Sequence, residues 1–520
     1  MTKEFNITGV CFPDEHYMAD VSAKLAEIMK MVIKGNYFII NRPRQYGKTT
    51  TLFNLSTTLN ESQEYLALNM SFEGIGDSVF QSESGFSNRF VQLMAEEAEE
   101  IDANLSIWAY EQAALINDMG DLSKFISDFV RKSSKKVVVL IDEVDKSSNN
   151  QLFVSFLGVL RNKYLKRKTA KTFHSVVLAG VHDVKSLKLK LRPDEESKNN
   201  SPWNIATDFK VDMNLNPAEI TSMLEDYIAD KQVKMDKEYI ANRLFYYTAG
   251  HPFLVSKLCK MMDEEVLPFK QKLEWTTNDL DTVVKKLIKE RNTNFETIGK
   301  NLEDNQALYQ LVYRVAVDGE TISYNALAPI MHTAEMYGLF VERNNRVTIH
   351  NRIYQEVVVN YMIAKLEQVG FGKPVDIGTG YKNADKSLNM EAVLTKFQEF
   401  MKEQYSQKER TFLEHSGRLV FLAFIKPIIN GAGYDFKEVQ ISEEHRLDVV
   451  ITYLQKLYIA ELKIWRGSVA HEEGLLQLAD YLDRMGLSEG YLVVFDHRKG
   501  KSWDQEWVEV QSKRIFCIWV

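Results

Sequence analysis

The sequence predicts a multidomain α/β protein, and three observations carry that prediction. The chain has 520 residues, which is too many for one compact core and suggests roughly three or four domains. Short apolar runs alternate with amphipathic stretches up to residue 210, as in a parallel sheet covered by helices. A glycine-rich stretch at 366–385 then separates a region in which helical patterns are followed by strand patterns.

The first domain is predicted at 1–210 and carries the strands of a parallel sheet. Their apolar runs are Tyr37–Ile40, Tyr65–Asn69, Lys136–Ile141 and Ser175–Ala179. Helical patterns separate these runs, which is typical of parallel strands joined by crossover helices. A polar stretch that begins and ends near prolines, 192–202, predicts a loop near the end of the domain.

Helical patterns dominate the next two domains, a helical lid at 211–300 and a smaller unit at 301–368. In the lid, Pro217 after Asn216 indicates a helix start, and Gly250-His251-Pro252 separates two helices. In the smaller unit, three helical segments precede a hairpin, an order that resembles a winged helix. The helical segments are Leu308–Ala316, Tyr324–Met331 and Ala334–Tyr337, and the hairpin strands are Leu339–Glu342 and Val347–His350.

The last domain is predicted at 386–520, with helices first and strands afterwards. One helix is expected around Phe412–Phe424 and a later one at Glu472–Arg484. The predicted strands are Lys437–Ile441, Leu447–Tyr453, Lys456–Lys463, Glu489–Phe495 and Arg514–Val520. This domain is therefore expected to be α/β as well.

Composition and charge limit the class of protein. The chain is 45% hydrophobic and 26% charged with 10 prolines, so long disordered tracts are not expected. Its net charge of -8 argues against a globally basic nucleic-acid binder, although a local basic channel stays open. Three widely spaced cysteines indicate a reducing compartment, and no apolar run is long enough for a membrane span. We therefore expect a cytoplasmic protein without membrane contact.

A phosphate-binding loop is predicted between the first strand and the following helix. The segment Arg42–Thr49 ends in Gly47-Lys48-Thr49, although Arg42 stands where the usual pattern has a glycine. Such a loop needs backbone N–H groups that converge on phosphate oxygens at a helix N-terminus. Lys48 would neutralise the β- and γ-phosphates, and the Thr49 hydroxyl would ligate Mg²⁺. The residues expected to contact the nucleotide are Arg44, Gln45, Tyr46, Gly47, Lys48, Thr49 and Thr50.

Two carboxylates after the third strand strengthen this prediction. Lys136–Ile141 has the pattern of a central strand, which places Asp142 at the carboxyl edge of the sheet. Asp142 would hold Mg²⁺ through water, and Glu143 would polarise the attacking water as a catalytic residue. Past the fourth strand, His182 is either a sensor of the γ-phosphate or a solvated loop histidine. Gly250-His251-Pro252 either approaches the nucleotide or is only a helix-breaking turn.

The loop Arg42-Pro43-Arg44-Gln45-Tyr46-Gly47-Lys48-Thr49 resembles the variant Walker A motif of the bacterial AAA-ATPase-like family, and Leu140–Asp145 resembles its Walker B motif. The similarity extends to about residue 365. It implies an AAA+/STAND-related P-loop NTPase domain that binds ATP rather than GTP. Members of this family are frequently fused to a C-terminal PD-(D/E)XK nuclease-like domain.

A second group of charged residues is predicted in the last domain. One strand carries Asp448, and its expected antiparallel partner carries Glu461 and Lys463, which are two residues apart and therefore on one face. Two carboxylates bind Mg²⁺, which polarises a phosphodiester and activates water, while the lysine stabilises developing charge. On the following helix, Gln477 and Tyr481 are expected to face the sheet.

This pattern resembles the core of the PD-(D/E)XK nuclease superfamily, an α/β restriction-endonuclease-like fold. The resemblance identifies the helix at Phe412–Phe424 with the first helix of that core and Glu414 with a further metal-binding carboxylate. It implies metal binding by Asp448, Glu461 and Glu414, and a catalytic set of Asp448, Glu461, Lys463 and Gln477.

Three functions fit these patterns. The first is an ATP-binding and ATP-hydrolysing P-loop ATPase coupled to a Mg²⁺-dependent nuclease that acts on nucleic acid, with DNA favoured over RNA. The second is a nucleotide-gated signalling or binding module whose nuclease-like domain does not cleave. The third, a DNA-binding regulator, is weakened because the helix expected at Tyr324–Met331 contains no Arg or Lys. A homo-oligomer is compatible with each, and Arg161 or Arg192 is a candidate to serve a neighbouring subunit's nucleotide.

Overall fold

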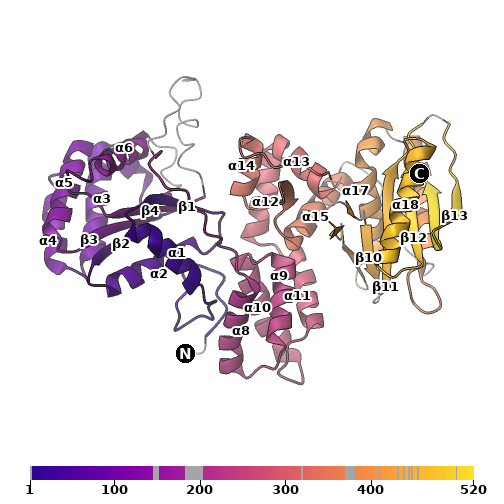
Figure 1. Cartoon of the computed structure of the whole chain (residues 1–520), viewed down its shortest axis with the longest axis horizontal. Helices are drawn as coiled ribbons and strands as arrows, with labels where there is room; N and C mark the ends of the chain where they lie inside the picture. The colour runs from indigo at the N-terminus through magenta and orange to yellow at the C-terminus, as the bar shows by residue number, and fades with distance from the viewer. Residues whose placement is uncertain are drawn as a thin grey trace. The chain divides into compact units, whose positions relative to one another are not determined.

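The structure is a computed structural model, and its chain divides into two compact units (Figure 1). Unit 1 comprises Met1–Asn301, Tyr324–Arg343 and Thr348–Tyr354, and unit 2 comprises Leu302–Ser323, Asn344–Val347 and Gln355–Val520. The residues that the structure describes are 3–144, 151–181, 203–317, 320–368, 381–407, 410–429, 433–436, 440–442, 445–446, 449–453, 456–498 and 500–520. Three residues with a predicted role, His182, Arg192 and Asp448, lie outside this set.

A parallel sheet forms the first part of unit 1, in the order β1-β4-β3-β2 (Figure 1). Its strands are β1 Tyr37–Asn41, β2 Tyr65–Ser71, β3 Lys136–Asp142 and β4 Ser175–Gly180. Each predicted strand is confirmed and continues one or two residues further. The sequences of these strands are continuous apolar runs because helices cover both faces of the sheet.

The helices of this part form one layer on each face of the sheet (Figure 1). Helices α1 Ser22–Ile33 and α2 Lys48–Glu61 pack with Phe38 and Ile40 of β1 in one core. The other face of the sheet, including Tyr37 and Ile39, packs against a larger helical layer. That layer consists of η1 Asp77–Gln81, α3 Glu83–Ala98, α4 Ala103–Ala113, α5 Met119–Lys132 and α6 Gln151–Leu165. This arrangement places the carboxyl ends of all strands at one edge.

A group of helices follows in unit 1, in the segment predicted as a helical lid, and these helices are called the lid below. Its helices are α8 Pro217–Lys231, α9 Lys237–Thr248, α10 Pro252–Met261 with the short turns η4 Met262–Val266 and η5 Leu267–Phe269, and α11 Thr277–Lys289. The predicted start of α8 is confirmed, because Asn216 caps it and Pro217 is its first residue. Between α9 and α10, Gly250 has φ +77°, and a Cβ there would lie 2.0 Å from the carbonyl oxygen of Leu215. Only glycine fits this turn.

The segment after the lid contains helices and a hairpin. These elements are α12 Thr293–Asp304, α13 Gln306–Ala316, α14 Pro329–Met336, β5 Phe340–Arg343, β6 Arg346–Ile349 and α15 Arg352–Gln368. Asn344 and Asn345 both have positive φ, as a two-residue hairpin turn requires. The helix predicted at Tyr324–Met331 is wrong, because α14 begins only at Pro329. Proline disfavours a helical residue before it, so 324–328 stays irregular. The winged helix stays a prediction.

Unit 2 ends in a mixed sheet in the order β13-β14-β12-β11-β10-β7. Helix α18, Ser468–Arg484, packs on one face of it. Helices α16 Met390–Gln407 and α17 Arg410–Ile429 contact one another through Phe397 and Phe421, whose ring centroids lie 5.0 Å apart. The strands are β7 Gly433–Phe436, β10 Val449–Tyr453, β11 Lys456–Ile464, β12 Glu489–Phe495, β13 Gln505–Val510 and β14 Lys513–Trp519. A separate two-stranded sheet joins β8 Gln440–Ser442 to β9 His445–Arg446.

Some strands of unit 2 differ from prediction. The sequence pattern missed β7 and β13, both at the edges of the sheet. Edge strands carry few buried residues, and β13 has none, so they lack the apolar signal. Of the strand predicted at Lys437–Ile441, only 440–441 lie among the described residues.

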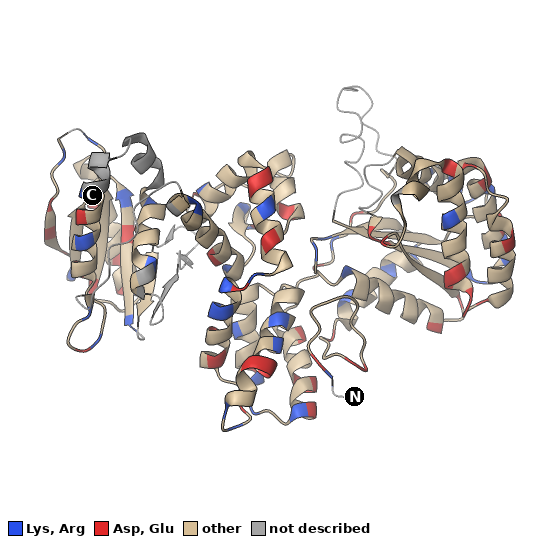
Figure 2. Cartoon of the chain, turned by 180° about the vertical axis from the view of Figure 1, so that it is seen from behind, with Lys and Arg blue, Asp and Glu red and all other residues tan. Residues whose placement is uncertain are grey.

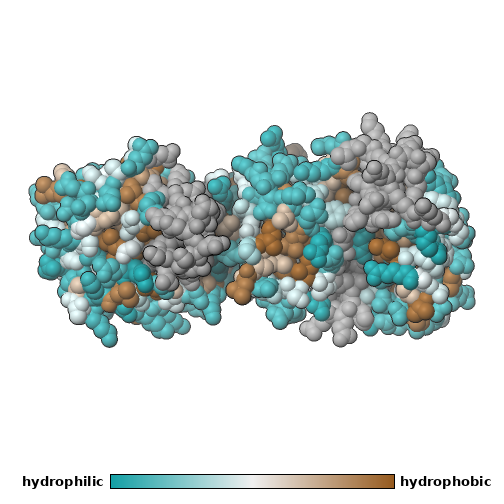
Figure 3. Space-filling view, turned by 90° about the horizontal axis from the view of Figure 1, so that it is seen from above, coloured by the Kyte–Doolittle hydropathy of each residue, from teal (hydrophilic) through white to brown (hydrophobic). Residues whose placement is uncertain are grey.

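The visible face of the molecule is mostly hydrophilic, with apolar residues scattered over it (Figure 3). Leu327 is the most exposed of the large apolar side chains among the described residues, at 91%. None of the helices in the described part of the chain is long and apolar enough to cross a membrane.

Candidate functional site

The loop between β1 and α2 contains two residues with left-handed backbone geometry. Gln45 and Gly47 have φ of 61° and 72°, and this left-handed geometry turns the chain sharply into α2. Gly47 caps α2 without any side-chain hydrogen bond to the first turn. A Cβ at Gly47 would meet nothing within 4 Å, so no other part of the described chain covers the backbone at this position. The first N–H groups of a helix attract an anion, and here no side chain competes as a cap.

Arg42, which replaces the usual first glycine, holds the loop through its side chain. Its Nη1 donates to the carbonyl oxygen of Asn41 at 3.0 Å and its Nη2 to that of Val211 at 2.9 Å. The guanidinium also lies 5.1 Å from the ring centroid of Phe209. Burial lowers the pKa of Arg42, and the nearby Asp212 opposes that shift. The arginine thus ties the phosphate loop to the segment that leads into the lid.

Lys48 is buried and hydrogen-bonded within the phosphate loop. Its side chain is only 7% exposed, and Nζ donates to the carbonyl oxygens of Arg42 at 3.0 Å and Pro43 at 2.9 Å. These two hydrogen bonds offset part of the free-energy cost of burying the ammonium group. The lysine therefore links the two ends of the loop through the carbonyls of Arg42 and Pro43.

The remaining predicted contacts of the loop differ in exposure. Arg44 and Thr49 are exposed, as side chains that reach a ligand or metal from solvent would be. The Thr50 hydroxyl instead accepts a hydrogen bond from the backbone N–H of Cys11 at 3.1 Å. Thr50 therefore anchors the N-terminal segment to α2. This contact was not expected, because Thr50 is predicted to contact the nucleotide.

Tyr46 is buried and meets two histidines. Its hydroxyl lies 2.9 Å from Nε2 of His350, and its ring centroid lies 4.4 Å from that of His251. His251 is fully buried, and its Nε2 lies 3.0 Å from the Tyr354 hydroxyl. Gly250-His251-Pro252 is thus a helix-breaking turn whose histidine packs against Tyr46 of the phosphate loop, and its approach to the nucleotide stays a prediction.

Two further loop residues contact distant parts of unit 1. Asn294 Nδ2 donates to the Gln45 side-chain oxygen at 3.0 Å. A Cβ at Gly338 would lie 3.0 Å from Pro43, so this glycine lets the chain approach the loop closely. The phosphate loop is therefore contacted at Gln45 and Tyr46 by residues that follow it by more than two hundred positions, namely Asn294 and His350.

Asp142 and Glu143 lie at the carboxyl end of β3, at the same sheet edge from which the loop leaves β1. Asp142 is 4% exposed, and its Oδ1 accepts the backbone N–H of Glu143 at 2.9 Å. Glu143 has φ 53°, a left-handed conformation that costs roughly 1–2 kcal/mol for a residue with a side chain. Such strain is often found at functional sites.

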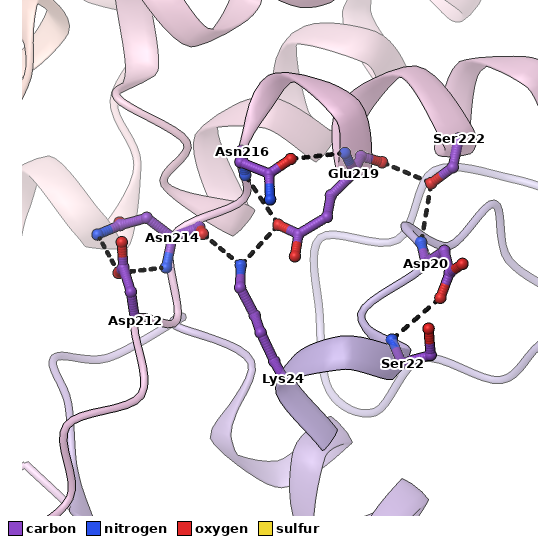
Figure 4. A network of polar contacts seen from close by, with 8 residues as sticks. All are labelled: Asp20, Ser22, Lys24, Asp212, Asn214, Asn216, Glu219 and Ser222. Atoms are coloured by element: carbon purple, nitrogen blue, oxygen red, sulfur yellow. Dashed lines mark hydrogen bonds and ion pairs between the residues drawn. The ribbon is translucent and has the colours of Figure 1, made fainter. Parts of the chain in front are cut away.

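The lid is joined to α1 by a polar network (Figure 4). Lys24 Nζ lies 2.6 Å from Glu219 Oε2 and 2.5 Å from the carbonyl oxygen of Asn214. Glu219 also forms the capping box of α8 with Asn216. One carboxylate therefore fixes both the start of the first lid helix and its contact with the sheet domain.

In unit 2, Glu461 and Lys463 lie together on β11 as predicted. Lys463 Nζ is 2.8 Å from Glu461 Oε1, and Glu461 is 2% exposed. The predicted hairpin is confirmed, because β10 pairs antiparallel with β11 and aligns Val449 with Ala460. Lys463 also donates to the Gln477 side-chain oxygen at 3.3 Å. Strand and helix thus bring a carboxylate, a lysine and an amide to one place.

The helix α18 presents its two predicted residues differently. Tyr481 is buried in the core under the sheet, whereas Gln477 is exposed and reaches Lys463 from the rim. Leu478 fills the position that Gln477 was expected to take. The stem of Lys463 lies over Gly474, where a Cβ would be 3.7 Å from Lys463 Cγ.

The metal set predicted in unit 2 is only partly described. Asp448 lies outside the described residues, and Glu414 belongs to α17 but its side chain is not described. Within the described part of the chain, no group of three or more His, Cys, Asp or Glu residues is arranged to hold a metal. The described donor that suits Mg²⁺ is the Glu461 carboxylate.

Sequence patterns missed His350 and Asn294, which contact the loop, and Tyr354, which contacts His251. His350, Tyr354 and Asn294 stand in helical or strand patterns without a motif of their own. Arg42 was noted only as a departure from the usual glycine, although its position before Pro43 keeps it extended and able to reach Val211.

Comparison with known proteins assigns a family to the first two thirds of the chain. A family model described as AAA-like domain matches residues 14–360. An uncharacterized WD repeat-containing protein of Synechocystis is 22% identical over 317 residues, which cover 56% of this chain and 25% of that relative. The chain thus spans about a quarter of the length of the curated relative that it matches.

Three solved structures illustrate the partial structural similarity. The Walker-type ATPase of Pyrococcus abyssi is 11% identical with TM-score 0.46, over 68% of this chain and 99% of that one. Aeropyrum pernix ORC2 is 13% identical with TM-score 0.39, over 70% and 98%. Thermotoga maritima RuvB is 13% identical with TM-score 0.34, over 66% and 96%. By the match over 14–360, the chain belongs to the AAA-like domain family.

Proposed function

We propose that this protein is an ATP-binding and ATP-hydrolysing enzyme whose C-terminal domain is a Mg²⁺-dependent PD-(D/E)XK-type nuclease acting on nucleic acid, DNA in particular. We assign the ATPase domain to 1–210, the lid to 211–300, a winged-helix-like domain to 301–368 and the nuclease-like domain to 386–520. The single observation that carries the nuclease is the buried Glu461 carboxylate held against Lys463 on β11.

The nucleotide site is proposed from the loop geometry. ATP phosphates would lie beside Gly47, where the backbone leaves open space at the start of α2. Lys48 would exchange its bonds to loop carbonyls for bonds to phosphate, because a charge-assisted pair is stronger than a bond to a neutral carbonyl. Thr49 and Asp142 would hold Mg²⁺, and Glu143 would orient the attacking water.

The nuclease site is proposed from unit 2. Mg²⁺, when bound, would polarise the phosphodiester and lower the pKa of water. Glu461 would supply a metal ligand, with Asp448 and Glu414 as the other proposed carboxylates. Lys463, held by Glu461 and Gln477, would stabilise negative charge on the phosphate.

Cleavage by the Glu461→Gln variant tests this function. The substitution keeps the shape of the side chain but removes the anionic ligand, so we expect loss of Mg²⁺-dependent cleavage of labelled DNA and RNA by at least about a hundredfold. Glu473→Gln, an exposed carboxylate on α18, is the matched control and should cleave like the wild type. Equal cleavage by Glu461→Gln and the wild type would remove the proposed metal site.

A nucleotide-gated binding or signalling module is the second candidate. The contacts of the phosphate loop favour it, because Lys48 and Tyr46 are both hydrogen-bonded to protein groups. In that case nucleotide binding would release these contacts as a switch, and the C-terminal domain would bind without cleaving. Tight ATP binding with slow turnover, and no cleavage of any nucleic acid by wild type, would favour this module.

A further inference from the structure

Helix α9 carries an exposed stripe of aromatic and arginine side chains in unit 1. Tyr239, Arg243 and Tyr246 are spaced four and three residues apart, so they share one face of the helix. Tyr239 is 58% and Tyr246 is 37% exposed. Exposed tyrosines next to an arginine are typical of binding surfaces rather than of a solvated helix face.

Tyr246 holds two arginines close to one another. The Arg352 Cζ lies 4.0 Å from the Tyr246 ring centroid, and the Arg243 Cζ lies 4.9 Å from it. Arg243 is fixed further by Asp281, whose Oδ1 is 3.2 Å from Nη2, and by the ring of Tyr247 at 4.9 Å. The guanidinium groups are therefore positioned by packing rather than left to solvent.

Three more cations belong to the same region. Arg343 Nη2 donates to the carbonyl oxygen of His350 at 3.1 Å, and reduced hydration together with the charge of Arg352 lowers the pKa of Arg343. On α11, burial and the charge of Lys289 lower the pKa of Lys285, which Asp281 opposes. We call Arg243, Lys285, Lys289, Arg343 and Arg352, with Tyr239 and Tyr246, the basic–aromatic surface. Basic segments are visible on the lid helices in Figure 2.

Clustered cations on a protein whose net charge is -8 call for an explanation. Asp281 offsets part of the repulsion among these cations, and a bound polyanion would offset the remainder. Arginine fits phosphate because its planar fork donates two parallel hydrogen bonds. The exposed rings add a feature that an acidic peptide does not need, since nucleic-acid bases stack on aromatic side chains.

We propose that the basic–aromatic surface of the lid binds a single-stranded nucleic acid, with phosphates on Arg343, Arg352 and Arg243 and a base on Tyr239. This inference deepens the proposed function, because it rests on nucleic acid as partner and adds a contact outside the C-terminal domain. It also explains how a chain with acidic net charge could hold nucleic acid locally.

Fluorescence anisotropy of the full chain with a fluorescein-labelled oligothymidylate of about 20 nucleotides tests the proposal. The titration contains no Mg²⁺ and no ATP, so the result is independent of cleavage and of nucleotide binding. We expect Arg352→Ala and Tyr239→Ala each to weaken binding about tenfold, and Arg352→Ala to reduce the salt slope by about one. Arg352→Lys should recover part of the affinity, because it restores the charge without the planar fork.

Arg167→Ala is the matched control. Arg167 lies 3.8 Å from the Tyr164 ring in the sheet domain of the same unit, so its removal deletes a similar arginine–tyrosine pair. Unchanged affinity in Arg352→Ala and Tyr239→Ala, or an equal loss in Arg167→Ala, would overturn the proposal. So would competition by polyglutamate as strong as that by unlabelled oligothymidylate, since the surface would then prefer any polyanion. A nuclease-dead Glu461→Gln protein that still binds the oligonucleotide supports the surface even if the proposed function fails.

Discussion

The Tyr46 hydroxyl of the phosphate loop lies 2.9 Å from Nε2 of His350. The proton of this pair can be placed from its neighbours. Asn351 Oδ1 accepts the backbone N–H of Tyr354 at 2.8 Å, so its Nδ2 faces His350 Nδ1 at 3.1 Å and donates to it. Nδ1 of the neutral ring is thus an acceptor, and Nε2 carries the proton that is donated to Tyr46. His350, the residue after β6, thereby holds the phosphate loop by donating a hydrogen bond to the Tyr46 hydroxyl.

Tyr46→Phe should destabilise the protein without removing apolar contacts. The buried Nε2–H of His350 would lose its acceptor, which costs about 1–3 kcal/mol. The free energy of unfolding in urea measures the effect. Tyr110→Phe, at an exposed tyrosine of α4, should change it by less than about 0.5 kcal/mol. Equal stability of Tyr46→Phe and the wild type would show that the pair contributes nothing.

His350 should make stability depend on pH. Burial lowers the pKa of His350 from 6.5 to about 4, and the Arg343 charge adds to the shift. Between these pH values the unfolded chain binds a proton that the folded chain does not, so stability is full above about 6.5 and falls as the pH drops toward about 4. The loss is on the order of 3 kcal/mol.

The comparison with His350→Gln isolates this contribution. Urea unfolding from pH 7 to pH 5, roughly the upper part of that window, should show a steeper loss for the wild type than for His350→Gln. Parallel stability curves for the two proteins would contradict the burial of a neutral His350.

Arg42→Gly should weaken the fold but keep nucleotide binding. Glycine restores the usual motif for phosphate, yet it deletes the bonds from the guanidinium to the carbonyls of Asn41 and Val211. We expect a loss of about 1–3 kcal/mol in unfolding free energy and retained affinity for fluorescent ATP. A loss of affinity with unchanged stability would mean that Arg42 serves the nucleotide rather than the loop.

The ion pair between Lys24 and Glu219 should couple the sheet domain to the lid. Both side chains are largely buried, so a double-mutant cycle with Lys24→Met and Glu219→Gln should give a coupling of about 1–3 kcal/mol. The more exposed pair of Lys237 and Glu225 should give at most about 0.5 kcal/mol in the same cycle. Similar coupling in both pairs would argue against a special role for the network of Figure 4.

The sequence predicted the strands of the parallel sheet well, because β1 to β4 are buried on both faces and leave continuous apolar runs. The edge strands β7 and β13 leave no such run and were missed. Glu461 and Lys463 were placed together correctly, since their spacing on one strand fixes a common face.

Contacts over long sequence separation could not be predicted. Nothing near His350 in sequence indicates that it meets Tyr46, and the closure of Lys48 on its own loop carbonyls depends on the loop conformation. Gln477 was expected under the sheet, but the helix phase that buries Leu478 and Tyr481 turns it to the rim. A pattern of apolar residues gives such a phase only approximately.

The initial rate of DNA cleavage with Mg²⁺, measured with and without ATP in the wild type and in Lys48→Ala, tests the proposed coupling of the two sites most directly. ATP should change the wild-type rate, because phosphates would take Lys48 from the carbonyls of Arg42 and Pro43. Lys48→Ala should cleave at one rate whether ATP is present or not, while Lys30→Ala, at an exposed lysine of α1, should respond like the wild type. An ATP response that persists in Lys48→Ala, or a wild type that cleaves equally with and without ATP, would contradict control of the nuclease by this loop.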